Sequence, residues 1–234
     1  RSSDLDSGRG HTGAGGDRVS VEQLRLAVYR GFADTGRAPT GQELAVTLGV
    51  SEDTVRWGLH TLHEQRHIVV RDGAVAMAHP FSSVPLGFSV MGPQTLWWGG
   101  CAWDSFALPH LVGVDVLVAT RCPGCGRALA WNVDNRTPPS GDEVAHFLLP
   151  VTMLWDDVVH ACGNQRLFCG EPCVAEWLTA TGQERGCVMD LATLWRLAQH
   201  WYEGRLSRGY ERRDPTTAAA YFASVGLKGP FWGQ

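Results

Sequence analysis

The sequence predicts an α+β protein in which a winged-helix-like helical domain precedes a mixed α/β domain with short strands. Apolar residues recur with the period of an amphipathic helix near the N-terminus, beginning at Val21, Leu24, Val28 and Phe32. From residue 79 onward, short β-branched runs and helical segments alternate, separated by proline and glycine. The 234 residues, 44% of them apolar, can bury a core in one domain or in two unequal ones.

The N-terminal region divides into a tail and a helical unit. Residues 1–18 are rich in Gly, Ser, Asp and Arg with a single Leu, and we expect a flexible tail because they cannot bury enough apolar surface. Residues 19–78 carry the order helix, helix, turn, helix and hairpin, which is typical of a winged-helix fold.

Capping and turn residues mark the limits of these elements. Thr40 has the character of a helix N-cap, and Gly49 is expected to end that helix. Ser51 is expected to cap the next helix, with acidic residues in its first turn. Asp72-Gly73 lies between two short β-rich runs and predicts a tight hairpin.

The helix predicted at residues 51–65 argues against a nucleic-acid partner. It offers one cation, Arg56, against three carboxylates, whereas a DNA-reading element uses several Lys or Arg on phosphates. We therefore expect this unit to be a packing scaffold. The net charge of −4 likewise gives no general attraction to nucleic acid or to an acidic membrane.

Residues 79–234 are expected to form the second domain. A strand-like segment, TLWWGG, leads to a helix that should begin at Cys101 and stop at Pro109. The other expected strands are VDVLVATRC (114–122), ALAWNV (128–133) and HFLLPV (146–151), and the other expected helices are EPCVAEWLTAT (171–181), 191–207 and 216–227.

Cys101, Asp104 and the distant Cys162 provide two thiols and a carboxylate. Thiolates are soft ligands that bind soft metals such as Hg(II). A free thiol is mostly protonated at neutral pH, so the helix N-terminus at Cys101, after Gly99-Gly100, is expected to stabilise its thiolate.

Asp104 lies one helical turn from Cys101 and could carry a proton between a thiol and a leaving carbon. Donating that proton near neutral pH requires a raised pKa, which we expect from burial by aromatic residues. The residues expected to bury it are Trp97, Trp98, Trp103 and Phe81. By spacing alone, two structural cysteines and a helix-capping Asp would also account for these three residues.

Two segments resemble the organomercurial lyase (alkylmercury lyase, MerB) family: WWGGCAWDSFALPHLVG (97–113) and DDVVHACGNQRLFC (156–169). The resemblance covers about residues 20–234. It implies a winged-helix-like domain before a mixed α/β domain of 79–234. It also implies that Cys101 and Cys162 bind mercury and that Asp104 shuttles the proton, so that a carbon–mercury bond is cleaved to hydrocarbon and Hg(II) without an organic cofactor. One departure is Gly163, where some better-known members have a second thiol.

Four further cysteines, Cys122-x2-Cys125 and Cys169-x3-Cys173, have the spacing of metal-binding turns. Two such pairs predict a closed, all-cysteine structural Zn(II) site, which better-known family members lack. Two other interpretations remain: a redox-active pair, disfavoured because no helix follows Cys122, and thiols that relay Hg(II) away from the active site. An odd total of seven cysteines, without a disulfide pattern, favours a cytoplasmic protein.

The remaining candidates are expected to be structural. Cys187 should be a small buried apolar residue, the adjacent Asp156 and Asp157 should be helix caps and not metal or acid/base groups, and His79 should be a structural residue. Four arginines are expected to form a solvated face: Arg205, Arg208, Arg212 and Arg213.

The expected partners are an organomercurial substrate and, for product release, free thiols or a protein that accepts mercuric ion. No membrane partner is expected, since the sequence lacks an apolar run of membrane-spanning length. Two alternatives stay open: a metal-binding or metal-responsive regulator on the same scaffold, and a lyase acting on another carbon–heteroatom bond.

Overall fold

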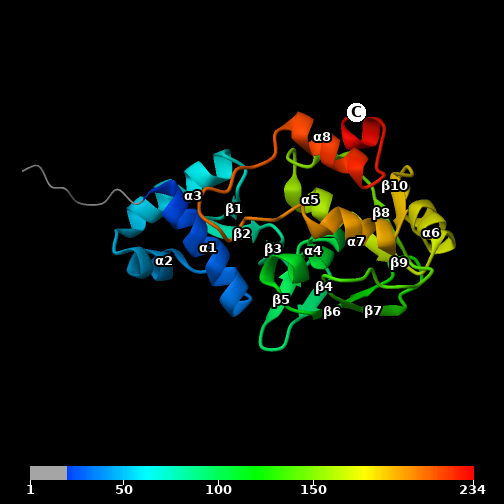
Figure 1. Cartoon of the computed structure of the whole chain (residues 1–234), viewed down its shortest axis with the longest axis horizontal. Helices are drawn as coiled ribbons and strands as arrows, with labels where there is room; N and C mark the ends of the chain where they lie inside the picture. The colour runs from blue at the N-terminus through cyan, green and yellow to red at the C-terminus, as the bar shows by residue number, and fades with distance from the viewer. Residues whose placement is uncertain (1–19) are drawn as a thin grey trace, which may run out of the picture.

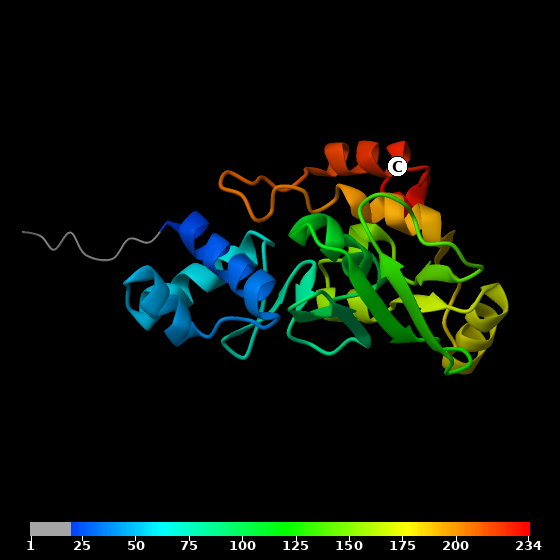
Figure 2. The same cartoon turned by 60° about the horizontal axis from the view of Figure 1, so that its bottom comes forward.

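A computed structural model describes residues 20–234 of the chain, which form two antiparallel sheets and the helices that pack against them (Figure 1). The tail predicted at residues 1–18 lies outside the described residues. The N-terminal helices gather at one end of the molecule and α6 (Glu171–Thr181) lies at the other, in both Figure 1 and Figure 2. Within residues 20–234, no helix has both the length and the apolar character needed to cross a membrane.

Three helices and a hairpin form the first part of the chain, in the predicted order. They are α1 (Val21–Thr35), α2 (Gly41–Leu48), α3 (Glu52–Glu64), β1 (Val69–Arg71) and β2 (Ala74–Ala78). Thr40 caps α2, Gly49 ends it in a left-handed conformation, and Ser51 caps α3, as expected. Asp72 (φ 50°) and Gly73 (φ 76°) make the tight turn between β1 and β2. The winged-helix assignment itself stays a prediction.

The larger sheet has the strand order β1-β2-β3-β5-β4-β6-β7. Its further strands are β3 (Phe81–Ser82), β4 (Phe88–Met91), β5 (Leu96–Gly99), β6 (Val116–Arg121) and β7 (Ala128–Val133). Because β2 pairs with β3, the N-terminal hairpin and the rest of this sheet are continuous. The domain boundary between residues 78 and 79 stays a prediction.

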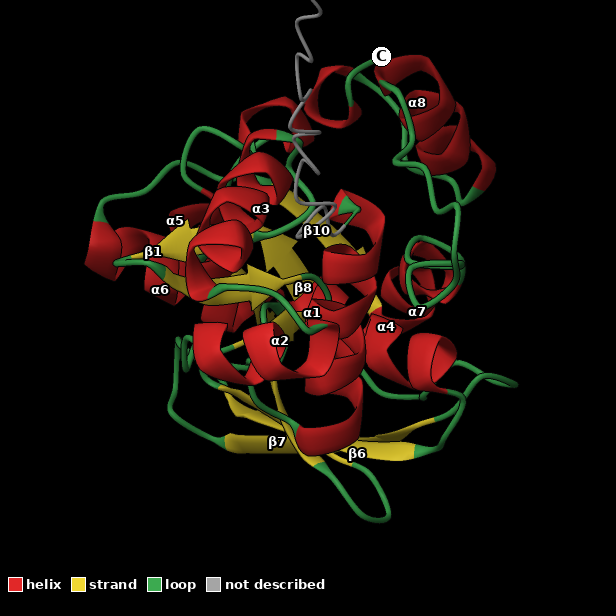
Figure 3. Cartoon of the chain, turned by 90° about the vertical axis from the view of Figure 1, so that its left-hand side faces the viewer, coloured by secondary structure: helices red, strands yellow, loops and turns green. Residues whose placement is uncertain are grey.

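The smaller sheet has the order β10-β8-β9. Its strands are β8 (Val144–Phe147), β9 (Gln165–Phe168) and β10 (Cys187–Asp190). The remaining helices are α4 (Ala102–Val112), η1 (Val151–Met153), α5 (Val158–Gly163), α7 (Leu191–Gln199), α8 (Pro215–Ser224) and η2 (Pro230–Trp232). Figure 3 shows β6 and β7 at one edge of the molecule and α8 at the opposite edge.

Helix α4 is the central element of the core. It contacts β4, β5 and β6 of the larger sheet, β9 of the smaller sheet, and α7. Every residue from 102 to 109 is buried, which is typical of a helix that is apolar on all sides. The N-terminus of α4 is therefore held at the junction of the two sheets.

Three predicted element limits were wrong. Pro109 does not stop α4, which continues to Val112 and ends at Gly113 (φ 74°). The proline forfeits one backbone hydrogen bond, but the burial of its neighbours and the bond from Gly113 N–H to Pro109 O maintain the helix. The strand predicted at 146–151 begins at Val144 and ends at Phe147, before the turn at η1. The helix predicted at 191–207 ends at Gln199, because the chain then turns inward to bury Tyr202.

Candidate active site

Cys101 is placed by the junction between β5 and α4. It is the N-cap of α4, with extended backbone, and its Sγ accepts a hydrogen bond from the Asp104 N–H at 3.3 Å. The preceding Gly100 lies against the start of the helix. A Cβ at that position would overlap the Asp104 carboxylate and come within 2.9 Å of Met77 Cε, so only glycine lets the chain pass this close.

A cavity of about 70 Å³ opens over the N-terminus of α4. It contains all three residues predicted to be catalytic: Cys101, Asp104 and Cys162. Its other lining residues are His79, Trp103, Leu154, Trp155, Val158, Gln165, Trp201, Tyr202, Arg205 and Arg212.

The Asp104 carboxylate is at the centre of a buried hydrogen-bond network. His79 Nδ1 lies 2.9 Å from Oδ2, and the Tyr202 hydroxyl donates to Oδ1 at 2.5 Å. Cys162 Sγ lies 4.0 Å from Oδ2. The carboxylate is 1% exposed, so solvent contributes little to its interactions.

The expectation of a raised pKa for Asp104 was wrong. Burial does raise this pKa, but the interactions of the carboxylate with His79, Tyr202 and Cys101 lower it, and the net direction is downward. Asp104 is therefore a carboxylate at neutral pH and is ready to accept a proton.

Cys101 and Cys162 are buried thiols that line the same cavity, and the Cys101 Sγ donates a hydrogen bond to Gln165 Oε1 at 3.0 Å. Burial is the main reason that the pKa of Cys101 is raised well above its usual range, and the neighbouring Cys162 and Asp104 raise it further. The interaction with the Cys101 sulfur lowers the pKa of Cys162, but burial and the charge of Asp104 raise it, and the net direction is upward.

Both cysteines are therefore neutral thiols at rest, and the prediction of a stabilised Cys101 thiolate was wrong. The helix N–H does reach the sulfur, as expected, but its effect is smaller than that of burial beside a carboxylate.

The aromatic residues around Asp104 are not those that the sequence indicated, apart from Trp103. Trp97 donates from Nε1 to the Phe32 carbonyl of α1 at 3.0 Å, Phe81 stacks on Phe32, and Trp98 is 42% exposed. The cavity is lined instead by Trp103 together with Trp155, Trp201 and Tyr202.

Three residues that contact Asp104 or Cys101 were not predicted from the sequence: His79, Tyr202 and Gln165. His79, expected to be structural, faces Asp104, and Tyr202 reaches Asp104 from 98 residues away in the chain. Gln165 is three residues beyond Cys162, and this closeness is the one signal that could have pointed to it.

Arg205 is buried, at 6% exposure, and was wrongly placed on a solvated face. Its guanidinium donates to the His79 carbonyl at 2.7 Å and to the Tyr29 hydroxyl at 2.9 Å, and lies 4.5 Å from the Tyr202 ring centre. Arg205 therefore connects α1 to His79 and Tyr202, the two residues that contact the Asp104 carboxylate oxygens.

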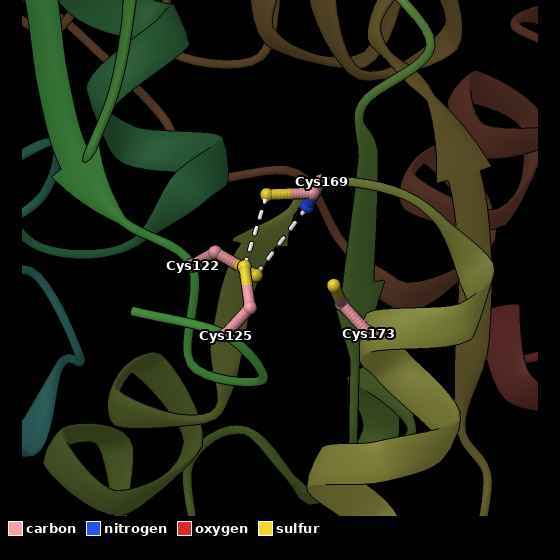
Figure 4. Close-up of side chains that lie close together, drawn as sticks. All are labelled: Cys122, Cys125, Cys169 and Cys173. Carbon is pink, nitrogen blue, oxygen red and sulfur yellow. Dashed lines mark hydrogen bonds between the residues drawn. The ribbon is translucent and has the colours of Figure 1, made fainter. Parts of the chain in front are cut away.

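The second predicted cysteine set also comes together in space (Figure 4). The sulfurs of Cys122, Cys125, Cys169 and Cys173 all lie within 4.8 Å of one another. None of the seven cysteines forms a disulfide, and Cys187 lies outside both the cavity that contains Cys101 and Cys162 and the four-cysteine group.

Of the two adjacent carboxylates predicted to cap a helix, Asp157 has that role. It caps α5 by accepting from His160 N–H at 3.0 Å, and it pairs with Arg71 at the same distance. It is exposed and is not among the residues that line the cavity.

A buried pair of thiols beside a carboxylate defines a site that can bind a soft metal and move a proton. The MerB family model, described as alkylmercury lyase, matches residues 81–203, more than half of the chain. The chain belongs to the alkylmercury lyase family and is an enzyme of that family.

Two known proteins illustrate the relationship. The alkylmercury lyase of Staphylococcus epidermidis is 24% identical over 213 residues, covering 87% of this chain and 90% of that protein. The crystal structure of the mercury-bound form of MerB2 superimposes with a TM-score of 0.59 at 16% identity, covering 80% of this chain and 98% of that one. The likeness to MerB2 shows a shared fold.

Proposed function

We propose that this enzyme cleaves carbon–mercury bonds by protonolysis, with Cys101 and Cys162 as mercury ligands and Asp104 as the proton carrier. The observation that supports this most strongly is the Asp104 carboxylate, held beside two buried thiols and 4.0 Å from one of them. Family membership supports an organomercurial substrate.

Mercury binding supplies the proton for the reaction. An organomercury cation, R–Hg⁺, first binds one thiol, and the sulfur–mercury bond replaces the S–H bond. The released proton passes to Asp104, which is a carboxylate at rest. The second thiol then binds mercury and loses its proton in turn.

The carbon–mercury bond breaks when Asp104 delivers its proton to the carbon. The bonding pair of that bond becomes the new C–H bond, so hydrocarbon leaves and Hg²⁺ stays on two thiolates. The balance is R–Hg⁺ + 2 Cys–SH → R–H + Cys–S–Hg–S–Cys + H⁺. Free thiols, or a protein that accepts mercuric ion, would then remove the product.

His79 and Tyr202 act in this scheme as positioning residues for Asp104. They contact different carboxylate oxygens, at 2.9 Å and 2.5 Å, and so fix the plane of the carboxylate next to the thiols. By lowering its pKa, they keep Asp104 able to accept a thiol proton.

The aromatic wall accommodates the organic group. Trp103, Trp155 and Trp201 present apolar faces to the cavity, which suit an alkyl or aryl substituent on mercury. A dry surrounding also strengthens the interaction of Asp104 with developing charge.

The test uses phenylmercury with an excess of small thiol and measures benzene release by gas chromatography. The expected result is catalytic benzene release by the unaltered protein, lost in Cys162→Ser. The matched control is Cys187→Ser, which alters a cysteine outside both groups and should release benzene at the unaltered rate. Benzene release by Cys162→Ser at that rate would refute the assignment of the second thiol.

A further inference from the structure

The four-cysteine group lies where the two sheets approach each other. Cys122 directly follows β6 of the larger sheet, and Cys169 directly follows β9 of the smaller sheet. Cys125 completes the turn after β6, and Cys173 is in the first turn of α6 (Figure 4). Each sheet therefore contributes one pair of thiols.

The sulfur separations match a tetrahedral zinc site. Zn–S bonds of about 2.3 Å place four sulfurs about 3.8 Å apart. The sulfurs of this group all lie within 4.8 Å of one another, and those of Cys125 and Cys169 are 3.4 Å apart. Such a site requires the widest pair to move inward by up to about 1 Å and the sulfurs of Cys125 and Cys169 to move apart by about 0.4 Å.

The backbone around the thiols is also arranged for a metal. The Cys169 N–H donates to Cys122 Sγ at 3.4 Å, the kind of bond that orients a thiolate ligand. The Gly126 N–H closes the turn on Cys122 O at 2.8 Å. A Cβ at Gly124 would overlap the Cys173 carbonyl, so this glycine allows the turn to reach α6.

We propose that Cys122, Cys125, Cys169 and Cys173 bind one structural Zn²⁺ that fastens the smaller sheet to the larger one. Zinc is favoured because four thiols fill a tetrahedral shell and leave no open position for a reaction. The thiols are small and mostly not fully buried, so without a metal they contribute little apolar packing between the two sheets.

The zinc site also sets the distance between the two catalytic thiols, a consequence that rests on the proposed function. Cys101 follows β5 of the larger sheet, and Cys162 precedes β9 of the smaller one. Strand β9 spans about 13 Å between Gln165, which accepts from Cys101, and the zinc site at Cys169. The metal thus anchors the far end of the strand that leads to the active site.

The experiment measures the metal content of the full chain, purified under reducing conditions from zinc-supplemented medium, by elemental analysis. One zinc per chain is expected, and about none in Cys122→Ser/Cys173→Ser. Cys187→Ser is the matched control and should retain one zinc. Removing zinc with a chelator should lower the Tm by about 10 °C or more, reversibly.

Cobalt binding is measured on the unaltered protein, so the result does not depend on whether a variant folds. Co²⁺ added to the chelated protein should give the visible absorption of a tetrahedral thiolate complex, and Zn²⁺ should abolish it. No zinc in the purified protein, zinc retained by the double variant, or a disulfide within the group would overturn the proposal. Mercury displacing the zinc during turnover would show a relay instead and would also overturn it.

Neither metal content nor Tm depends on lyase activity, so failure of the zinc proposal and failure of the proposed function are distinguishable. Hydrocarbon release should fall when zinc is removed and return when it is restored. Unchanged release by the zinc-free protein would overturn the effect on thiol spacing and leave the lyase assignment intact.

Discussion

Replacing Tyr202 by Phe would remove one hydrogen bond from the buried Asp104 carboxylate while conserving the volume of the ring. The bond runs from the hydroxyl to Oδ1 at 2.5 Å, and both side chains are buried. A hydrogen bond to a charged group contributes about 1.5–3 kcal/mol, so the free energy of unfolding at neutral pH should fall by that amount. For a chain of this length, the Tm should fall by about 3–12 °C.

The loss should depend on pH with a defined sign. The folded-state pKa of Asp104 is lowered, so its ionised form stabilises the fold above the unfolded-state pKa, and this stabilisation disappears as the pH falls through the folded-state pKa. Tyr202→Phe should therefore cost most at neutral pH and least in acid. The same change should raise the pKa of Asp104 and move the acidic limb of the activity profile to higher pH.

Chemical denaturation across pH, with activity profiles on the same samples, is the assay. Tyr221→Phe is the matched control, because its hydroxyl donates to the uncharged Leu197 carbonyl at 2.8 Å, and its effect should be smaller and independent of pH in this range. If both variants lost equal stability with the same pH dependence, the assigned charge on Asp104 would be refuted.

Two further predictions concern residues that surround or position Asp104. Gly100→Ala should destabilise the protein by about 1–3 kcal/mol and reduce activity, because the new Cβ would overlap the Asp104 carboxylate and crowd Met77. The control is Gly41→Ala, whose Cβ would meet open space, so denaturation and rate assays should show unchanged stability and activity. Arg205→Met should lower stability by about 3 kcal/mol, since it removes charged hydrogen bonds that include one to the His79 carbonyl; unchanged denaturation midpoints would contradict this.

Local features of the sequence predicted much of the fold. Thr40 and Ser51 cap helices at the predicted positions, and the helix expected to begin at Cys101 has Cys101 as its N-cap, because the start of a helix depends largely on neighbouring residues. The hairpin at Asp72-Gly73 follows from the same kind of short-range rule. The spacing of two cysteine pairs likewise indicated that their sulfurs would meet.

The chemistry of the site depended on contacts that spacing does not encode. Tyr202 reaches Asp104 only because the chain turns inward after α7. His79 reaches Asp104 only because it lies in the turn between the paired strands β2 and β3. These contacts reverse the direction of the Asp104 pKa from the one that burial alone predicts. Likewise, Pro109 is tolerated because the helix that contains it is buried on all sides.

A single turnover of phenylmercury by Asp104→Asn tests whether Asp104 delivers the proton to carbon, with bound mercury and released benzene measured on the same sample. We expect mercury to bind as tightly as in the unaltered protein and benzene to form at least about a hundredfold more slowly. Benzene formed at the unaltered rate would show that Asp104 is not the proton donor.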